Sequence, residues 1–126
     1  MRRVYLACAL DMINVGDLDL IAQARHYGDR LVLGVLSDED VQRRTGRAPV
    51  MNLASRLEVA RHLRAVDEVV VHDDTVVSAG DDGTTILTVA QQSDGPGIDA
   101  HVVLRPRVIS RSRALRRALR PVPQPA

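Results

Sequence analysis

The stretch VYLACALDMINVGDLDLIAQARHYGDRLVLGVLSDED, residues 4–40, decides the fold. A short apolar run over residues 3–9 predicts a buried β-strand, and the continuous apolar run over 31–36 is typical of a strand in a parallel sheet covered on both faces. Apolar residues between these runs recur at helical spacing and predict a helix over about 16–27, which Gly28 is well placed to cap. The stretch therefore predicts a strand, a helix and a second strand in succession.

The same alternation continues further along the chain. Ser37 with Asp40 predicts a capping box that opens a short helix, Asn52 caps a helix over 53–65, and residues 66–71 form a third strand. Strands and helices that alternate in this order predict a single α/β domain, with an open parallel sheet flanked by helices. In such sheets ligands bind at the carboxyl ends of the strands, which places a site in the loop after the first strand.

The last third of the chain has a weaker pattern. Residues 84–92 are either a short helix or a strand, because they mix strand formers with helical spacing. Residues 100–104 are predicted to be another strand and 110–119 a final helix. We expect one domain over residues 1–120 and a stiff, disordered Pro-rich tail over 121–126.

Composition limits the class of protein. The chain has 126 residues, 45% hydrophobic and 26% charged, which predicts one globular domain with a modest core. No apolar run approaches the roughly 20 residues of a membrane-spanning helix, so no membrane partner is expected. The single cysteine, Cys8, excludes an internal disulfide and suits a cytoplasmic location, and we expect it to be a small apolar strand residue.

Charge and aromatic content argue against nucleic acid as a partner. The net charge is +1, and the chain has two Tyr but no Phe or Trp to stack on bases. All 17 basic residues are Arg, and seven of them lie between Arg105 and Arg120. We expect a solvated basic helix face there. No Cys or His pair has the spacing of a zinc site.

Two short motifs in the first loop carry the functional information: Cys8-Ala9-Leu10-Asp11 and Asn14-Val15-Gly16-Asp17. Their layout resembles the glycerol-3-phosphate cytidylyltransferase family, whose opening motif is Gly-Thr-Phe-Asp followed closely by His-x-Gly-His. Residues 47–71 resemble the segment that follows in that family, and 108–112 resemble its Ile-Ser-Thr motif. The resemblance implies a Rossmann-like nucleotidyltransferase domain in which a substrate phosphate attacks the α-phosphate of CTP and pyrophosphate leaves.

The resemblance also implies which residues form the site. Asn14 and Asp17 stand at the two catalytic histidine positions, and Arg105 stands four residues before Ile109, where the family has a triphosphate-binding arginine. In a second alignment, residues 98–104 are the family's fourth strand, and the chain then lacks the last strand. The implied nucleotide-binding positions are Ala9, Asp11, Gly16, Arg47, Arg105 and Ser110.

The substitutions at these positions predict weak chemistry. Asn14 can still donate a neutral hydrogen bond, whereas an ionised Asp17 only accepts and has the same sign as a triphosphate. Thr45 aligns with the family's loop lysine, and Arg44 or Arg47 could reach into the site in place of that lysine. Asp11 and Asp17 together could hold Mg²⁺ beside CTP. In the alternative interpretation Asp17 stabilises a helix N-terminus and Asp11 shapes a turn.

Three functions remain open at this stage. The first is a cytidylyltransferase-like protein that binds a nucleotide or a small phosphorylated ligand, with nucleotidyl transfer weak or lost, in effect a pseudoenzyme. The second is a non-catalytic homo-oligomeric scaffold or partner subunit, because the resemblance implies a homodimer. The third is an active nucleotidyltransferase, or a repurposed enzyme that uses Asp17 as a general base.

Overall fold

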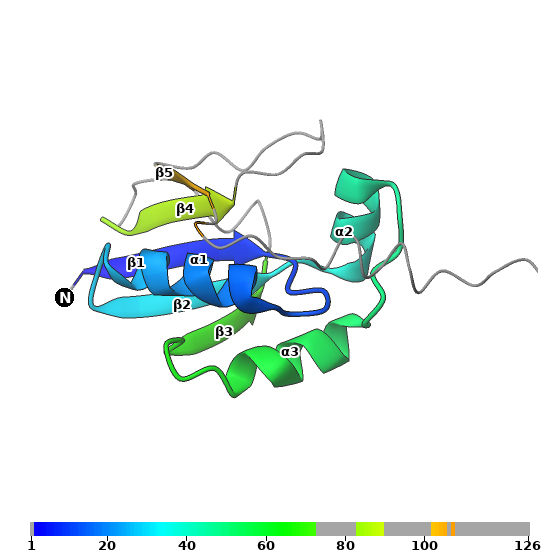
Figure 1. The fold of residues 1–126 in the computed structure, drawn as a ribbon, viewed down its shortest axis with the longest axis horizontal. Coiled ribbons are helices and arrows are strands. Elements are labelled where there is room, and N and C mark those ends of the chain that lie inside the picture. The colour runs from blue at the N-terminus through cyan, green and yellow to red at the C-terminus, as the bar shows by residue number, and fades with distance from the viewer. Residues whose placement is uncertain (1, 73–82, 90–101, 106, 108–126) are drawn as a thin grey trace, which may run out of the picture.

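A five-stranded sheet with helices packed on it organises the part of the chain that the structure describes (Figure 1). The structure is a computed structural model, and it describes residues 2–72, 83–89, 102–105 and 107. The predicted helix over 110–119, with Ser110, and the tail over 121–126 lie outside these residues. The elements are β1 (Arg3–Cys8), α1 (Val15–Arg25), β2 (Arg30–Val35), α2 (Asp38–Thr45), α3 (Leu53–Arg61), β3 (Glu68–Val71), β4 (Thr85–Val89) and β5 (Val102–Leu104).

The order of the strands identifies where a ligand would bind. The sheet runs β3-β2-β1-β4-β5, and every neighbouring pair is parallel. The chain moves outward from β1 to β3 and then continues on the other side with β4, so the order reverses between β1 and β4. This confirms the predicted open parallel α/β sheet, and it places the loop after β1 at the reversal point, where such sheets bind ligands.

One face of the sheet holds the main hydrophobic core. Alternate residues of the strands point to this face, as the period of two in a strand requires, and α1 and α3 pack against them. Cys8 is part of this core, which confirms it as a buried apolar strand residue. The buried members are Val4, Leu6, Cys8, Leu10, Leu20, Ile21, Ala24, Leu31, Leu33, Val35, Ala60, Leu87 and Leu104.

The second face carries a smaller buried cluster around Tyr5, Ala7, Val32 and Ile86. The ring of Tyr5 lies over Gly34, where an added Cβ would come within 1.9 Å of the Tyr5 hydroxyl oxygen. That hydroxyl is 2.6 Å from His72 Nδ1. Gly34 is therefore a glycine because the tyrosine ring occupies the space of its side chain.

Three expectations need correction or are resolved. Residues 85–89 pair with β1 as a strand, so the helical alternative for 84–92 is wrong, and so is the alignment that made 98–104 the fourth strand. Gly28 does not cap α1 with a left-handed residue, because the helix ends at Arg25 and is capped by His26. A Cβ at Gly28 would lie 2.5 Å from Val4 Cγ2, so the glycine permits close approach to β1 instead.

α3 also ends at Arg61 rather than near 65, and the turn that follows brings the partly buried Val66 against the core before β3. Among the described helices, none is long and apolar enough to cross a membrane.

Candidate functional site

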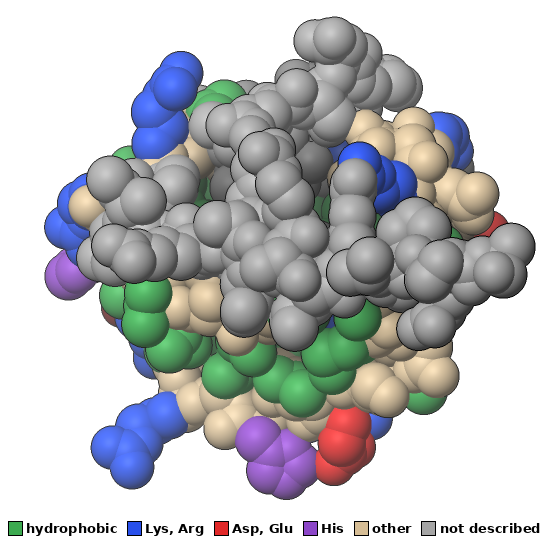
Figure 2. All heavy atoms as spheres, turned by 45° about the vertical axis from the view of Figure 1, so that its right-hand side comes forward, with side chains coloured by type: hydrophobic (Ala, Val, Ile, Leu, Met, Phe, Trp, Pro, Cys, Tyr) green, Lys and Arg blue, Asp and Glu red, His purple; other side chains and the backbone are tan. Residues whose placement is uncertain are grey.

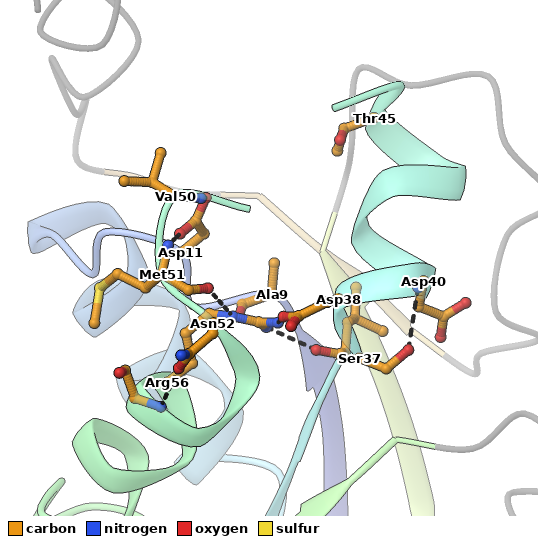
Figure 3. A network of polar contacts seen from close by, with 12 residues as sticks. Ala9, Asp11, Ser37, Asp38, Asp40, Thr45, Val50, Met51, Asn52 and Arg56 are labelled. Atoms are coloured by element: carbon orange, nitrogen blue, oxygen red, sulfur yellow. Dashed lines mark hydrogen bonds and ion pairs between the residues drawn. The ribbon is translucent and has the colours of Figure 1, made fainter. Parts of the chain in front are cut away.

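Three loops meet at the carboxyl edge of the sheet (Figure 3). Residues 9–14 leave β1, residues 36–37 leave β2 and lead into α2, and residues 46–52 connect α2 to α3. Except for Thr45 at the C-terminal end of α2, the polar residues labelled in Figure 3 come from these loops and from the first turns of α2 and α3. Segments far apart in the sequence are thus brought together where a ligand of this fold would bind.

Arg56 of α3 connects all three loops. Its side chain is fully buried, with no exposed surface. Nη1 donates to the carbonyl oxygens of Ala9 (2.8 Å) and Leu36 (2.7 Å), Nε donates to the carbonyl of Met51 (2.9 Å), and Nη2 donates to Asp38 Oδ1 (2.6 Å). A buried guanidinium is tolerated when its donors are satisfied in this way. The contacts fix the exits of β1 and β2 relative to the start of α3.

Asp11 makes a second connection between the same loops. Its Oδ2 accepts from the amide of Val50 and its Oδ1 from the amide of Met51, both at 2.9 Å. The residues on either side of it, Leu10 and Met12, both have φ of 56°, in the left-handed region that costs a non-glycine residue roughly 1–2 kcal/mol. Asp11 therefore holds a strained loop in place, and both of its oxygens are engaged in doing so.

A capping box closes the N-terminus of α1. Asn14 is the N-cap, and its Oδ1 accepts from the amide of Gly16 (2.9 Å), while Asp17 Oδ2 accepts from the amide of Asn14 (3.0 Å). The side-chain nitrogen of Asn14, Nδ2, donates to the Met12 carbonyl (3.3 Å). The structure thus brings the predicted residues Asn14, Gly16 and Asp17 together at the helix end, and the two side chains satisfy the protein's own backbone there.

A small cavity lies beneath this helix end, lined by Leu6, Cys8, Leu10, Asp17, Leu20 and Ile21. Its volume of about 10 Å³ is near the minimum that a single water needs, so it is far too small for a nucleotide. Burial raises the pKa of the Cys8 thiol well above its usual range, the Asp17 carboxylate raises it further, and Arg56 opposes the shift. Cys8 is therefore a neutral thiol at physiological pH and lacks the thiolate that a nucleophile needs.

Thr45 and Arg47, the residues at and near the expected lysine position, do not join this network. The Thr45 hydroxyl lies 2.7 Å from the Val41 carbonyl and 3.0 Å from the Arg47 carbonyl, at the C-terminal end of α2. Arg47 is exposed and follows Gly46, which ends the helix with φ of 77°. In Figure 3, Thr45 lies at the opposite end of α2 from Asp38, which bonds to Arg56.

The residues that leave β5 lie against α1. Asp19 Oδ2 accepts from the amide of Arg107 (2.7 Å), and Asp19 Oδ1 accepts from the Arg107 guanidinium at Nη2 (2.9 Å) and Nε (3.2 Å). Gln23 Nε2 donates to the Arg105 carbonyl (2.9 Å) and to Asp19 (3.0 Å). Bonds from the Arg107 backbone and then its side chain lower the pKa of Asp19 to about 2. The side chain of Arg105 is exposed.

The carboxylates of Asp11 and Asp17 bond to the protein's own backbone. Within the described ranges, no group of three or more His, Cys, Asp and Glu residues could hold a metal ion. Asp11 has both oxygens on backbone amides, and Asp17 bonds to the backbone of Asn14. The observed donors thus favour the interpretation of Asp11 as a loop-shaping residue and of Asp17 as a helix-terminus residue.

Sequence reasoning missed Arg56 and the Asp19 contacts. Arg56 lies on the same face of α3 as Leu53, Leu57 and Ala60, and a charge on an apolar face is a signal of a buried cation with polar partners. No comparable signal marks Asp19, because its partner Arg107 is 88 residues away in the sequence.

Comparison with known proteins identifies relatives of the chain. The model of a family described as cytidylyltransferase-like matches residues 9–121. An FAD synthase from Thermococcus sibiricus is 37% identical over 76 residues, which cover 60% of this chain and 51% of that protein. An ethanolamine-phosphate cytidylyltransferase from Arabidopsis thaliana is 40% identical over 68 residues, which cover 54% of this chain and 16% of that protein. The chain spans about half the length of the FAD synthase and less of the second relative.

A solved structure shows the same fold. The lipopolysaccharide core biosynthesis protein from Thermoplasma volcanium GSS1 superposes with a TM-score of 0.64 at 21% identity, over 87% of this chain and 99% of that chain. This identity is too low to carry more than the architecture.

Proposed function

Since the chain belongs to the cytidylyltransferase-like family, we propose that it binds a nucleoside triphosphate at the carboxyl edge of the sheet and transfers its nucleotidyl group slowly. CTP is the first candidate ligand. The match confirms the family resemblance read from the first loop. The observation that carries the proposal is the capping box of Asn14 and Asp17 at the N-terminus of α1. The resemblance of the first loop implies that the family's two histidines stand at these positions.

The binding half of the proposal is supported by the connected loops. Arg56 and Asp11 fix the exit of β1 relative to the start of α3 with bonds of 2.8–2.9 Å. Preorganised backbone is what phosphate recognition at a helix N-terminus needs, because the amides must not be reoriented on binding. Gly16 is buried in the first turn of α1, where it carries no side chain that would extend toward a ligand.

The slow-transfer half is supported by charge and by hydrogen-bonding capacity. Two like unit charges 4 Å apart cost about 4 kcal/mol at an effective dielectric near 20, so a triphosphate beside the Asp17 carboxylate is disfavoured. Losing one well-placed transition-state donor costs roughly 3–4 kcal/mol, a factor of 10²–10³ in rate. The Asn14 side-chain oxygen accepts from the Gly16 amide, and its side-chain nitrogen donates to the Met12 carbonyl. A phosphate oxygen would therefore have to compete for the Gly16 amide and for the Asn14 side-chain nitrogen.

Active transfer at an ordinary rate is the second candidate, because the curated relatives carry names of enzymes, FAD synthase and ethanolamine-phosphate cytidylyltransferase. In that case arginines would replace the missing histidines and lysine, with Arg44 and Arg47 as the candidates from the sequence. The same names give no support to the scaffold alternative. A homodimer and a cytoplasmic location stay predictions, and light scattering of the purified protein tests the first.

The test combines binding with turnover. Calorimetric titration with CTP and with ATP, each with and without Mg²⁺, should give saturable binding of one nucleotide per chain. Pyrophosphate release from CTP with glycerol 3-phosphate should stay well below about 1 per second, the low end of ordinary turnover. Release at or above that rate would establish the second candidate. Absence of any nucleotide binding by the folded protein would contradict the proposal.

A further inference from the structure

β5 forms the end of the described sheet that lies opposite β3 (Figure 1). It has three residues and pairs with only Leu87, Thr88 and Val89 of β4. Leu104 of β5 is buried in the core, whereas the Val103 side chain is 55% exposed. A strand this short makes few ladder bonds, so its attachment to the sheet depends on contacts beyond the ladder.

β4, the strand that β5 covers, has a sequence that favours pairing with other chains. Residues 85–89 read Thr-Ile-Leu-Thr-Val, in which four of the five residues are β-branched and none is charged or a proline. Segments of this composition pair with copies of themselves when their backbone groups are uncovered. Figure 2 shows other hydrophobic side chains on the surface, and such exposure alone is ordinary. The β4 edge differs because the described strands cover it with β5 alone.

Two side chains of α1 hold the segment that leaves β5. Asp19 accepts from the main-chain amide of Arg107 (2.7 Å) and from its guanidinium (2.9 and 3.2 Å). Gln23 donates to the Arg105 carbonyl (2.9 Å) and to Asp19 (3.0 Å), so the two side chains support each other. We call these contacts the α1–β5 clasp. Because two of its bonds reach main-chain atoms just after β5, the clasp fixes the path of the chain there and opposes detachment of the strand.

The arginines of this segment add charge at the same edge of the sheet. Arg105 directly follows β5 and is exposed, and the side chain of Arg107 is 67% exposed although it pairs with Asp19. Charged side chains that flank an apolar strand oppose edge-to-edge pairing, because pairing brings the like charges of two copies together. The clasp therefore keeps both the short strand and its charged flank at the edge of the sheet.

We propose that the α1–β5 clasp protects a latent interaction surface: it keeps β5 on β4, and its release opens the β4 edge to pairing with a second copy of this chain. The partner is a second copy because identical segments match one another in side-chain shape when they pair in register. The proposal goes beyond the proposed function and is independent of it, because no ligand takes part in the contacts that carry it.

Asp19→Ala tests the clasp, because alanine favours the helix but removes the acceptor for the amide and the guanidinium of Arg107. Glu58→Ala is the matched control, since it removes the same charge from an exposed pair with Arg61 on α3. Hydrogen exchange of the amides of β4 and β5 reports detachment. The Arg107 amide is left out of this comparison because it loses its own acceptor. Sedimentation velocity over a range of protein concentrations reports association.

At low protein concentration, Asp19→Ala should speed exchange in β4 and β5 about tenfold, the effect of one lost charge-assisted bond, while Glu58→Ala leaves it unchanged. Arg107→Ala should have a smaller effect, because its main-chain amide still bonds to Asp19. As the concentration rises, Asp19→Ala should associate beyond the state of the wild type. The β4 amides should then become protected again, because a second copy covers the edge that β5 has left.

Three results would overturn the proposal. Unchanged exchange in β4 and β5 of Asp19→Ala would show that the clasp does not hold the strand. Faster exchange without added association, or association that Glu58→Ala shows equally, would show that the opened edge does not recruit a second copy. Association that leaves the β4 amides in fast exchange would place the contact between copies on another surface.

Discussion

Replacing Arg56 with methionine should destabilise the fold far more than any other single arginine substitution in the described helices. Methionine keeps much of the length and the apolar stem but removes all four bonds that Arg56 makes. The carbonyls of Ala9, Leu36 and Met51 then lose their donor. Each unsatisfied buried acceptor costs about 1–3 kcal/mol. The Asp38 side chain is 42% exposed and can bond to water instead, so the loss of its bond to Arg56 adds little to the cost.

We therefore expect the free energy of unfolding to fall by about 3–5 kcal/mol. This is the low end of the sum for three carbonyls, because water that enters the site partly replaces the lost donors. This is a large share of the roughly 5–15 kcal/mol that stabilises a typical domain. For a chain of this size it corresponds to a fall in melting temperature of about 10–20 °C.

Urea unfolding followed by circular dichroism measures the loss directly. Arg61→Met on the same helix is the control, because the Arg61 side chain is 57% exposed and its substitution should change stability by about 0.5 kcal/mol or less. A loss for Arg56→Met within about 1 kcal/mol of this control would refute the reasoning, because three orphaned carbonyls cannot cost so little in a network that holds the loops.

Three further variants test the site and the contacts of α1. The triple variant Asn14→His, Asp17→His, Thr45→Lys should tighten CTP binding by about 1–3 kcal/mol in calorimetry, although loss of the N-cap should lower its melting temperature. No gain in a folded triple variant would mean that the pocket is closed. Gly16→Val should abolish CTP-induced thermal stabilisation, and retained stabilisation would place the phosphates elsewhere. Folding lowers the pKa of Asp19 from 3.8 to about 2, so its contribution to the free energy of unfolding is present above pH 4 and is lost as pH falls toward 2. Asp19→Asn should therefore make the free energy of unfolding depend less on pH between about 4 and 2.

The sequence was sufficient for the first three strands and the helices between them, because each of these elements has a local signal. The apolar runs of β1 and β2 and the N-caps Ser37 and Asn52 are patterns within a few residues of one another, and the structure contains them. Helix ends were placed less well, since α3 stops at Arg61 where packing of the following turn prevails over helical spacing.

The site was predictable only in part, because its bonds join distant segments. Motif alignment singled out Asn14 and Asp17, which the structure places together at the N-terminus of α1, and the Asn-x-x-Asp spacing is itself a capping-box pattern. The partners of Arg56 lie 5, 20 and 47 residues away along the chain, at Met51, Leu36 and Ala9. Such contacts arise from the sheet order and not from any local pattern.

The measurement that tests the central claim most directly is a nuclear magnetic resonance titration of labelled protein with Mg-CTP. The account predicts that the amide signals of Asn14, Gly16 and Asp17 shift progressively, because the phosphates approach the first turn of α1 and disturb its capping box. Signals at the far end of α3, around Arg61, should stay in place. Saturable shifts confined to another surface, with the amides of residues 14–17 unchanged, would contradict the account.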